Sequence, residues 1–567
     1  QIVSTSCSTA MFVLLLAPPL ISASAPFALP TAPPASVDAS DPIWDSRPYV
    51  DGRKTCVGGA VEAWSGPSEE VTSPVFDART GKRLVIGQLA TMGEVDAVRA
   101  VEASAAAWDR GQGAWPQMSL AERIERVEGA VAALKERRDE IVNVLMWEIA
   151  KNSADAAAEF DRTVAFIGKT IETLRRMDEE SAGWRVVSGV MAFVRRAAVG
   201  VMMLLGPYNY PFNETYAALI PALLMGNVVL MKIPNVGGLA HVLTFEVWTE
   251  ALPKGTLSFI SGSGRATVPP VMRTGLVDVL GFIGGSKAGD AILKEHPAPH
   301  RLKAFLQLDA KNLGVVAPDA DLDVAVGQCV VGSASYNGQR CTAIKLILVH
   351  HSIADEFVRR LASAVAALPR GLPWEEGVLI TPLPEPKKPA YLAELVGDAV
   401  AKGARVVNEG GGTLAGALMT PAVVFPVSRA MRLWHEEQFG PVIPVGVYRD
   451  EAEVVEYVRS SPFGQQAALF TQSTDAAAPL IDALSTSVGR INLNTQCGRS
   501  PDELPFSGRR SSALGTMSVS EALRVFSIET VVAGKAAQEP NRRLAKELPS
   551  SSAFMRALTD TPYRDEL

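Results

Sequence analysis

The chain has 567 residues, of which 47% are apolar, and a formal net charge of −7. This length exceeds what a single hydrophobic core serves, so we expect two or three globular domains. The acidic balance argues against a nucleic-acid partner, because phosphate binding favours a basic surface.

The five cysteines are few and irregularly spaced, which argues against a zinc site and against a disulfide framework. We therefore expect reduced thiols and no metal site. The cysteines are Cys7, Cys56, Cys329, Cys341 and Cys497.

Residues 1–49 differ in composition from the rest and are expected to form an N-terminal extension. The apolar run 11–21 is too short to span a bilayer, but it suits the core of a secretory signal, although no basic residue precedes it. The chain ends in YRDEL (563–567), which resembles lumenal retention signals. A disordered start and a chance acidic tail are the alternative, and no membrane span is predicted.

From Ser119 onward the sequence has a helical pattern. Ser119 and Glu122 have the spacing of a capping box, and apolar residues then recur at intervals of three and four. Long helices are predicted to continue to about Met177.

Between Ala198 and Gly285, short apolar runs that end in Gly or Pro alternate with segments of helix length, such as 213–226. This pattern predicts βαβ units of a parallel sheet buried on both faces, which is typical of a dinucleotide-binding domain. A second alternating set, from Val315 to about Arg490, predicts a further α/β unit.

Five motifs occur along the chain in a fixed order: GPYNYPFN (206–213), VLMKIP (229–234), FIGGSKAG (282–289), GQRCTA (338–343) and EEQFGPVIPV (436–445). Their order and spacing resemble the aldehyde dehydrogenase superfamily over roughly residues 60–530. Three further stretches resemble the branch that contains non-phosphorylating, NADP-dependent glyceraldehyde-3-phosphate dehydrogenase: EFDRTVAFI (159–167), SYNGQRCTAIK (335–345) and GRSPDELPFSG (498–508).

The resemblance implies an α/β fold with a Rossmann-type cofactor domain, an α/β catalytic domain and a β oligomerisation flap. We expect the cofactor domain over 50–308 and the catalytic domain over 309–488. The flap is expected from segments 188–198 and 489–535, in a homodimer or homotetramer. Residues 536–567 are charged and contain Ser and Pro, which predicts an arm or a disordered tail.

Cys341 matches the nucleophilic cysteine of the superfamily, although a lone cysteine is more often a buried structural thiol. In the family's chemistry the thiolate attacks an aldehyde, the adduct passes hydride to a nicotinamide, and water hydrolyses the thioester. An ordinary thiol is mostly protonated at neutral pH, so a cation such as Arg340 is expected to favour the thiolate. Asn209 matches the side-chain donor to the oxyanion, with the Cys341 N–H as the second donor.

Six residues match cofactor-binding positions of the family: Lys232, Asn235, Gly285, Ser286, Glu437 and Phe439. Lys232 matches the lysine that binds the adenosine ribose. Asn235 stands where NAD-preferring members often carry an acid, so NADP is the expected cofactor and NAD is the alternative. Ser286 and the neighbouring backbone match the helix N-terminus that meets the pyrophosphate, with Gly285 in place of the usual Ser. Glu437, with Phe439 after it, matches the acid that holds the nicotinamide ribose.

Arg162, Arg340 and Arg499 resemble the phosphate-binding arginines of the glyceraldehyde-3-phosphate enzymes. Arginine suits this role because its planar donors pair bidentately with phosphate oxygens. The alternatives are a solvated charge on a helix for Arg162 and an ordinary loop cation for Arg499.

The segment around the general base departs from the family pattern. In FLQLDAKNLG (305–314), Gln307 aligns with the catalytic Glu, and Gln cannot accept a proton. Positions two apart on an extended backbone face the same side, so Asp309 is predicted to project into the space of that Glu, displaced by about 6 to 7 Å. We hypothesise that Asp309 takes over the base role. Slow hydrolysis, acyl transfer to another acceptor and loss of catalysis are the alternatives.

The sequence therefore predicts NADP-dependent oxidation of an aldehyde, favouring glyceraldehyde 3-phosphate to 3-phosphoglycerate without phosphorylation. Another anionic aldehyde is the nearest alternative, and a catalytically silent structural or binding relative is a second one, because of Gln307. The resemblance implies a cytoplasmic location, whereas the two ends of the chain favour the secretory route, the lumen of the endoplasmic reticulum or a plastid.

Overall fold

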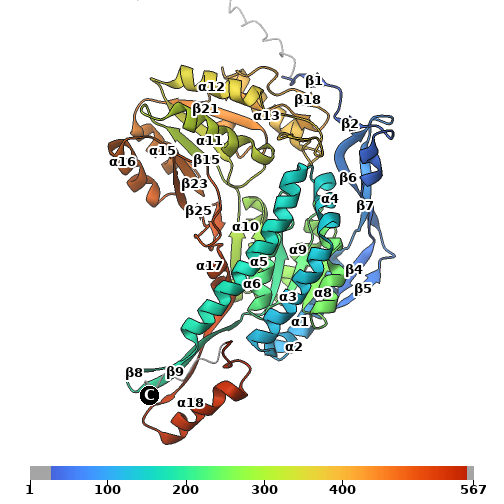
Figure 1. Ribbon diagram of the computed structural model, residues 1–567, viewed down its shortest axis with the longest axis vertical. Coiled ribbons are helices and arrows are strands. Elements are labelled where there is room, and N and C mark those ends of the chain that lie inside the picture. Colours follow the sequence, from blue (N-terminus) through green and yellow to red (C-terminus); the bar gives the residue numbers. More distant parts are fainter. Residues whose placement is uncertain (1–26, 559–567) are drawn as a thin grey trace, which may run out of the picture.

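The computed structural model describes residues 27–558 (Figure 1). Cys7, the apolar run 11–21 and the C-terminal YRDEL lie outside the described residues. Two large sheets form separate lobes, and an arm of antiparallel strands extends from the first lobe. Between residues 27 and 558, every helix is too short or too polar to cross a bilayer.

The first lobe is built on an eight-stranded sheet whose five central strands are parallel, as the apolar runs between Ala198 and Gly285 predicted. Antiparallel strands add both edges. In spatial order the strands are β26 (Ala513–Leu514), β14 (Lys303–Gln307), β13 (Val279–Ile283), β10 (Val201–Leu205), β11 (Val228–Lys232), β12 (Leu257–Ile260), β4 (Lys54–Val57) and β5 (Ala60–Ala63).

Alternate residues of β10 face two different cores, which explains why its sequence is apolar throughout. Met202 and Leu204 pack in a cluster with the helix over 213–224, whereas Val201, Met203 and Leu205 pack in a second cluster on the opposite face. The sheet is therefore covered by helices on both sides.

Helices of the first lobe follow the predicted pattern. Ser119 caps its helix as a capping box, since its N–H donates to Glu122 Oε2 over 2.8 Å. The helices are α1 (Glu94–Trp108), α2 (Ala114–Gln117), α3 (Leu120–Glu136), α4 (Arg138–Glu148), α5 (Ser153–Ser181), α6 (Asn213–Leu224), α7 (Leu239–Val242), α8 (Phe245–Ala251), α9 (Gly264–Arg273), α10 (Ser286–Lys294) and α17 (Val519–Val525).

The second lobe is built on a seven-stranded sheet that is parallel except at one edge. β24 lies in the segment expected to form the flap, and it pairs with β23 here. In spatial order the strands are β17 (Arg405–Val406), β20 (Ala422–Phe425), β21 (Val442–Tyr448), β16 (Ile344–His350), β15 (Asn312–Val316), β23 (Gln466–Phe470) and β24 (Arg490–Leu493).

The helices of the second lobe lie around this sheet (Figure 1). Apolar side chains of these helices pack in the same hydrophobic clusters as side chains of the strands. The helices are α11 (Leu322–Ala334), α12 (Ala354–Ala366), α13 (Lys388–Ala401), α14 (Arg432–His435), α15 (Glu451–Ser460) and α16 (Thr474–Ser485).

The described part of the N-terminal extension joins the two lobes. Its strand β1 pairs with β18 of the second lobe, and β2 pairs with β6 beside the first. The short strands and 3₁₀ helices are β1 (Thr31–Ala32), β2 (Ser36–Val37), β3 (Val50–Gly52), β6 (Ser68–Asp77), β7 (Arg83–Ala90), β18 (Leu414–Ala415), β19 (Leu418–Met419), β22 (Phe463–Gly464), β25 (Arg509–Arg510), η1 (Pro42–Ser46), η2 (Asp109–Gly111), η3 (Pro299–Arg301) and η4 (Ser335–Gly338).

The arm is a three-stranded antiparallel sheet of β8 (Trp184–Val187), β9 (Val190–Ala198) and β27 (Ser527–Lys535). Beneath it lies α18 (Glu539–Ser551), where we expected either an arm or a disordered tail (Figure 1). The helix is ordered because it docks: the Trp184 indole N–H donates to the Ala545 carbonyl over 2.9 Å.

Candidate active site

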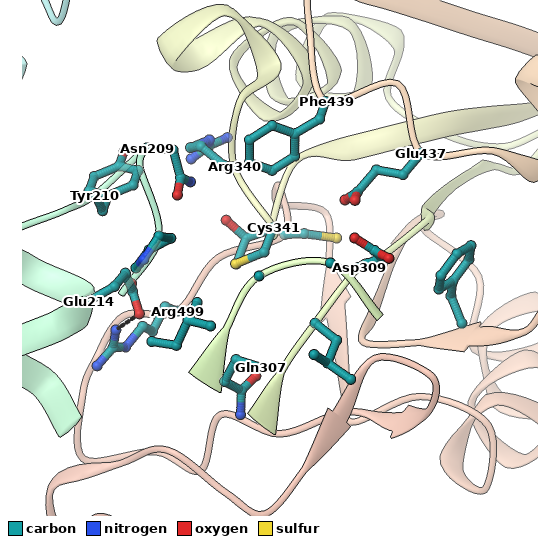
Figure 2. Close-up of a pocket in the computed structure, with 18 of the residues that line it drawn as sticks. Asn209, Tyr210, Glu214, Gln307, Asp309, Arg340, Cys341, Glu437, Phe439 and Arg499 are labelled. Atoms are coloured by element: carbon teal, nitrogen blue, oxygen red, sulfur yellow. Dashed lines mark ion pairs between the residues drawn. The ribbon is translucent and has the colours of Figure 1, made fainter. Parts of the chain in front are cut away.

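One cavity of about 1240 Å³ lies where the two lobes meet. Residues from both lobes line it, including most of those that the sequence singled out. They are Cys341, Asn209, Gln307, Asp309, Arg162, Arg340, Arg499, Gly285, Glu437 and Phe439. Figure 2 shows Cys341 in the middle, with Glu214 and Arg499 on one side and Asp309 and Glu437 on the other. Lys232, Asn235 and Ser286 do not line this cavity.

The turn before Cys341 is sharp. Tyr336 and Asn337 have positive φ angles of 46° and 56°, and Gly338 follows at 68°. A Cβ on Gly338 would lie 2.7 Å from the Gly440 carbonyl oxygen, so only glycine fits. The turn lies in η4, directly after α11, and leads into Arg340 and Cys341, which line the cavity.

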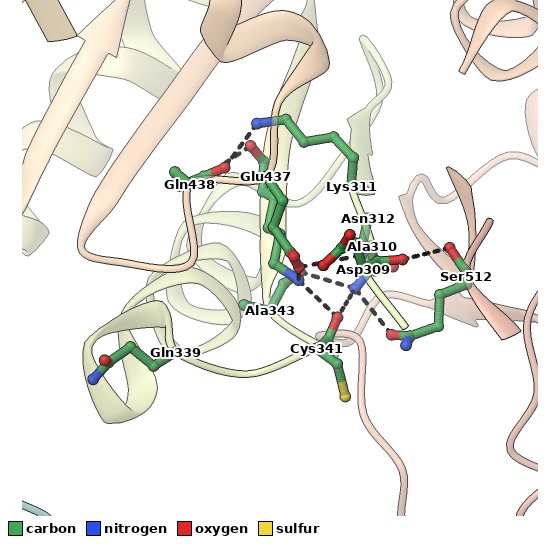
Figure 3. A network of polar contacts seen from close by, with 12 residues as sticks. Asp309, Ala310, Lys311, Asn312, Gln339, Cys341, Ala343, Glu437, Gln438 and Ser512 are labelled. Carbon is green, nitrogen blue, oxygen red and sulfur yellow. Dashed lines mark hydrogen bonds and ion pairs between the residues drawn. The ribbon is translucent and has the colours of Figure 1, made fainter. Parts of the chain in front are cut away.

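The Cys341 carbonyl is held from two sides (Figure 3). It accepts a hydrogen bond from Asn312 Nδ2 over 2.7 Å and another from Lys345 Nζ over 2.8 Å. Lys345 also pairs with Glu437 over 2.7 Å, which links the nucleophile loop to the expected ribose-binding acid. The position of Cys341 is therefore fixed by buried polar contacts.

Cys341 is the one cysteine that is not fully buried among the four in residues 27–558, and it lines the cavity. Burial, and after it the Glu214 carboxylate, raise its pKa to about 11, whereas Lys345 and Arg499 lower it. Arg340, which was expected to favour the thiolate, donates instead to the carbonyls of Val331 and Gly332 and to Gln496 Oε1.

Asn209 lies in the turn between β10 and α6 and is buried. Its Nδ2 donates to the Gln339 carbonyl over 2.8 Å, which brings the amide to the nucleophile loop. The turn is anchored by Glu159, whose Oε1 accepts the N–H groups of Phe212 and Asn213. One amide hydrogen of Asn209 is thus used by the loop.

Gln307 ends β14 inside the cavity, and its side chain is buried. Neither its amide oxygen nor its amide nitrogen has a hydrogen-bond partner within residues 27–558. Two residues on, Asp309 Oδ2 accepts the N–H of Ser286 over 2.8 Å, at the start of α10. Asp309 lines the same cavity, and its carboxylate is held at the helix N-terminus by this hydrogen bond.

Lys232 ends β11 and donates to Asn235 Oδ1 over 2.6 Å. Burial lowers the pKa of Lys232 to about 8, against a smaller opposing effect of Glu69. A neutral partner beside a buried ammonium leaves positive charge for an anion.

Glu437 lies at the other end of the expected cofactor site and accepts the Ala310 N–H over 3.2 Å. Burial raises its pKa, Lys345 opposes this, and Asp309 adds to it. Phe439, with a φ of 44°, meets the Tyr208 ring edge-on at 5.9 Å.

The three arginines reach the same cavity but differ in their partners. Arg499 Nη1 lies 2.6 Å from Glu214 Oε2, and Arg499 Nε lies 3.4 Å from Asp502 Oδ1. Arg162 Nη2 lies 3.0 Å from the same Asp502 oxygen. Two of the three cations are therefore already accompanied by carboxylates.

The sequence model of the aldehyde dehydrogenase family matches residues 64–532, most of the chain. The chain belongs to the aldehyde dehydrogenase family. The resemblance and the fold class drawn from the motifs are thereby confirmed.

Among curated relatives, an NADP-dependent glyceraldehyde-3-phosphate dehydrogenase of Streptococcus equinus is 34% identical to this aldehyde dehydrogenase over 470 residues, which cover 80% of this chain and 94% of the relative. A glutarate-semialdehyde dehydrogenase of Pseudomonas putida is 28% identical over 460 residues, 81% of this chain and 92% of the relative. A crystal structure of NADP-dependent glyceraldehyde-3-phosphate dehydrogenase from Bacillus halodurans C-125, complexed with NADP, has a TM-score of 0.77 and 29% identity, and the match covers 85% of this chain and 99% of that one.

Sequence reasoning missed two charged residues of this aldehyde dehydrogenase. Lys345 holds both the Cys341 carbonyl and Glu437, and Glu214 pairs with Arg499. Lys345 stood inside the quoted motif 335–345, and Glu214 follows the motif 206–213 directly. A charge at the start of an otherwise apolar helix was the signal that could have found Glu214.

Proposed function

We propose that the protein oxidises an aldehyde with NADP through a thioester on Cys341, and that glyceraldehyde 3-phosphate, oxidised to 3-phosphoglycerate without phosphorylation, is the favoured substrate. The observation that carries the proposal is one cavity that holds a cysteine, an amide donor and three arginines. The Streptococcus equinus relative, which is named an NADP-dependent glyceraldehyde-3-phosphate dehydrogenase, supports this cofactor and this substrate.

In the proposed acylation step, the Cys341 sulfur adds to the carbonyl carbon of the aldehyde, and the carbonyl oxygen takes the negative charge. Asn209 Nδ2 and the Cys341 N–H donate to that oxygen. Because burial and the Glu214 carboxylate raise the pKa of the thiol to about 11, the thiol must transfer its proton to water in the cavity before the sulfur attacks. Arg162, Arg340 and Arg499 would hold the phosphate at the far end of the substrate.

The residues around the expected cofactor site fit NADP. Lys232, with neutral Asn235 as its partner, would hold the 2′-phosphate. Gly285, Ser286 and the start of α10 would meet the pyrophosphate, where Asp309 now accepts the Ser286 N–H. Glu437 and Phe439 would hold the nicotinamide ribose and ring. NADP supplies the hydride acceptor when it is bound.

For hydrolysis of the thioester we propose Asp309 as the base, acting through a water molecule. The support is that Asp309 is a carboxylate on the cavity wall two residues from Gln307, which cannot accept a proton. Its contact with Ser286 must be given up or shared for this role. Gln307 would then orient water with its unpartnered amide.

An NADP-coupled assay over a small panel tests the proposed function. The panel contains glyceraldehyde 3-phosphate, unphosphorylated glyceraldehyde, a carboxylate semialdehyde such as glutarate semialdehyde, and propanal. We expect the highest kcat/KM for glyceraldehyde 3-phosphate, with NADPH measured by absorbance. A higher kcat/KM for the carboxylate semialdehyde would indicate that another anionic aldehyde is the substrate. NADPH formation from none of them, in a folded protein that binds NADP, would contradict the reaction.

A catalytically silent relative is the second candidate, and Gln307 together with the raised pKa of Cys341 favours it. The first milliseconds of the same assay separate the two. A burst of one NADPH per active site followed by a negligible steady state would mean that acylation works and hydrolysis fails. The absence of both phases would favour the silent relative.

We further propose a cofactor domain over 50–308, a catalytic domain over 309–488 and an oligomerisation flap around β9 and β27. Ile528 and Val531 on β27 are 52% and 57% exposed, which supports contact with another subunit of a dimer or tetramer. A cytoplasmic location is the simplest proposal, and the secretory route or a plastid is the alternative suggested by the ends of the chain.

A further inference from the structure

The substrate side of the cavity contains a partly buried carboxylate that the proposed reaction does not use. Glu214 lies in the first turn of α6, and its side chain is 16% exposed. It lines the cavity together with Cys341 and Arg499, whereas Asp502, the other carboxylate near Arg499, is not among the lining residues. Figure 2 shows Glu214 and Arg499 joined on the side of Cys341 away from Asp309.

Arg499 is positioned to bind an anion. Its side chain is 6% exposed, and the guanidinium lies 5.5 Å from the Phe166 ring centre and 5.9 Å from that of Phe506. Although Nη1 is 2.6 Å from Glu214 Oε2, neither Nη1 nor Nη2 has a hydrogen-bond partner of good geometry within residues 27–558. Buried guanidinium N–H groups that lack acceptors favour a ligand with oxygens to accept them.

Glu214 therefore occupies the space beside Arg499 that a substrate anion needs. Arg162 and Arg499 bring two positive charges to this side, and Glu214 and Asp502 bring two negative ones. A doubly charged phosphate that approaches Arg499 meets the Glu214 carboxylate at close range in a site with little water. A neutral aldehyde meets no such repulsion.

We propose that Glu214 is the specificity-determining residue of the substrate pocket: it is the resident counter-ion of Arg499, and an anionic substrate binds only by competing with it. This inference rests on the proposed function in taking the substrate to be an anionic aldehyde. The Glu214 charge weakens the binding of phosphorylated ligands and leaves neutral aldehydes unaffected. Removing the charge shifts the selectivity of the pocket towards phosphate.

The main test measures ligand binding without turnover, and a second measurement uses turnover of a neutral aldehyde. Cys341 is alkylated with iodoacetamide in the presence of increasing 3-phosphoglycerate. The protection constant is the 3-phosphoglycerate concentration that halves the alkylation rate of a variant, relative to the rate of that variant without ligand. In Glu214→Gln this concentration is expected to fall about tenfold, the effect of roughly one charged hydrogen bond regained by the guanidinium. In the same variant, the KM for propanal is expected to change less than about twofold.

Two matched variants serve as controls. Glu214→Asp keeps the charge and is expected to bind 3-phosphoglycerate more like the wild type than like Glu214→Gln. Glu385→Gln removes one negative charge from the same cavity wall, where Glu385 pairs with Lys388 over 2.9 Å rather than with Arg499. It is expected to leave the protection unchanged within about twofold. Thermal melting of each variant confirms that it is folded.

An unchanged protection constant in a folded Glu214→Gln protein would overturn the proposal. A shift of the protection constant in Glu385→Gln equal to that in Glu214→Gln would overturn it as well, because it would indicate a general effect of charge. Lack of protection in every variant would overturn it too, because Arg499 would then bind no anion. Failure of the aldehyde panel with the protection shift intact would remove the proposed reaction and leave the role of Glu214 standing.

Discussion

Two groups of residues in one cavity differ in how closely they match the family pattern. The residues proposed to form the thioester, Cys341 and Asn209, match the pattern: Asn209 Nδ2 donates to the Gln339 carbonyl, and the Cys341 carbonyl accepts hydrogen bonds from Asn312 and Lys345. The residues proposed to serve its hydrolysis, Gln307 and Asp309, depart from the pattern, and Gln307 has no polar partner in the described chain. Acylation and deacylation are separable steps with separate side chains, so a chain can keep the first while the second changes.

The largest expected effect comes from restoring a base on the hydrolytic side. In Gln307→Glu the steady-state rate of NADPH formation should rise by about 10²- to 10⁴-fold, the usual contribution of general base catalysis. The substitution removes no hydrogen bond within residues 27–558, and burial should raise the pKa of the new carboxyl towards neutrality, which suits a base. Stopped-flow absorbance would show the initial burst merging into a fast steady state.

Asp309→Asn is the companion experiment. If Asp309 is the base in the wild type, this variant retains the burst and loses the steady state, whereas Gln307→Glu with Asp309→Asn turns over. An unchanged steady-state rate in Asp309→Asn would show that Asp309 does not act in hydrolysis. Its role would then be limited to its contact with the Ser286 N–H at the start of α10.

The acylation side can be weakened by a single change. Asn209→Ala should slow the burst by about 10²- to 10³-fold, because a donor to the developing oxyanion is lost. The NADP dissociation constant, measured by the change in protein fluorescence, should stay the same, since Asn209 contacts the Gln339 carbonyl in the nucleophile loop. A burst slowed less than about threefold would show that the Cys341 N–H suffices, and would contradict the assigned role of Asn209.

The sequence could predict those parts of the molecule that depend on local pattern. The apolar runs that became β10 to β13 are recognisable because both faces of their sheet are buried, and the capping box at Ser119 needs only residues three apart. Cys341 and Asn209 were found because each lies inside a motif. All of these are properties of short, continuous segments.

Contacts between distant segments could not be predicted in the same way. Glu214 and Arg499 are far apart in the sequence and form their ion pair only in the folded chain. Asp309 was expected at the place of the missing Glu from the alternation of an extended strand, but β14 ends at Gln307, and beyond it the carboxylate reaches the Ser286 N–H. The C-terminal helix α18 is polar by sequence and docks on the arm: the Trp184 indole donates to the Ala545 carbonyl, and Arg195 of β9 donates to the carbonyls of Phe554 and Arg556 just after the helix.

The cofactor side offers the smallest expected effect and extends the comparison to the residues proposed to hold NADP. Lys232 has a pKa of about 8, lowered mainly by burial, so its ammonium is present below pH 8 and is lost above it. Because the ammonium attracts the 2′-phosphate, NADP affinity should fall by up to about tenfold per pH unit above pH 8. The phosphate, with a second pKa near 6, stays doubly charged over pH 7.5–9.5 and does not contribute.

Isothermal titration calorimetry across that range measures the slope. NAD, which lacks the 2′-phosphate, should show little of it, and Lys232→Met should abolish it. An equal slope for NADP and NAD would place the titrating group elsewhere and separate Lys232 from cofactor choice.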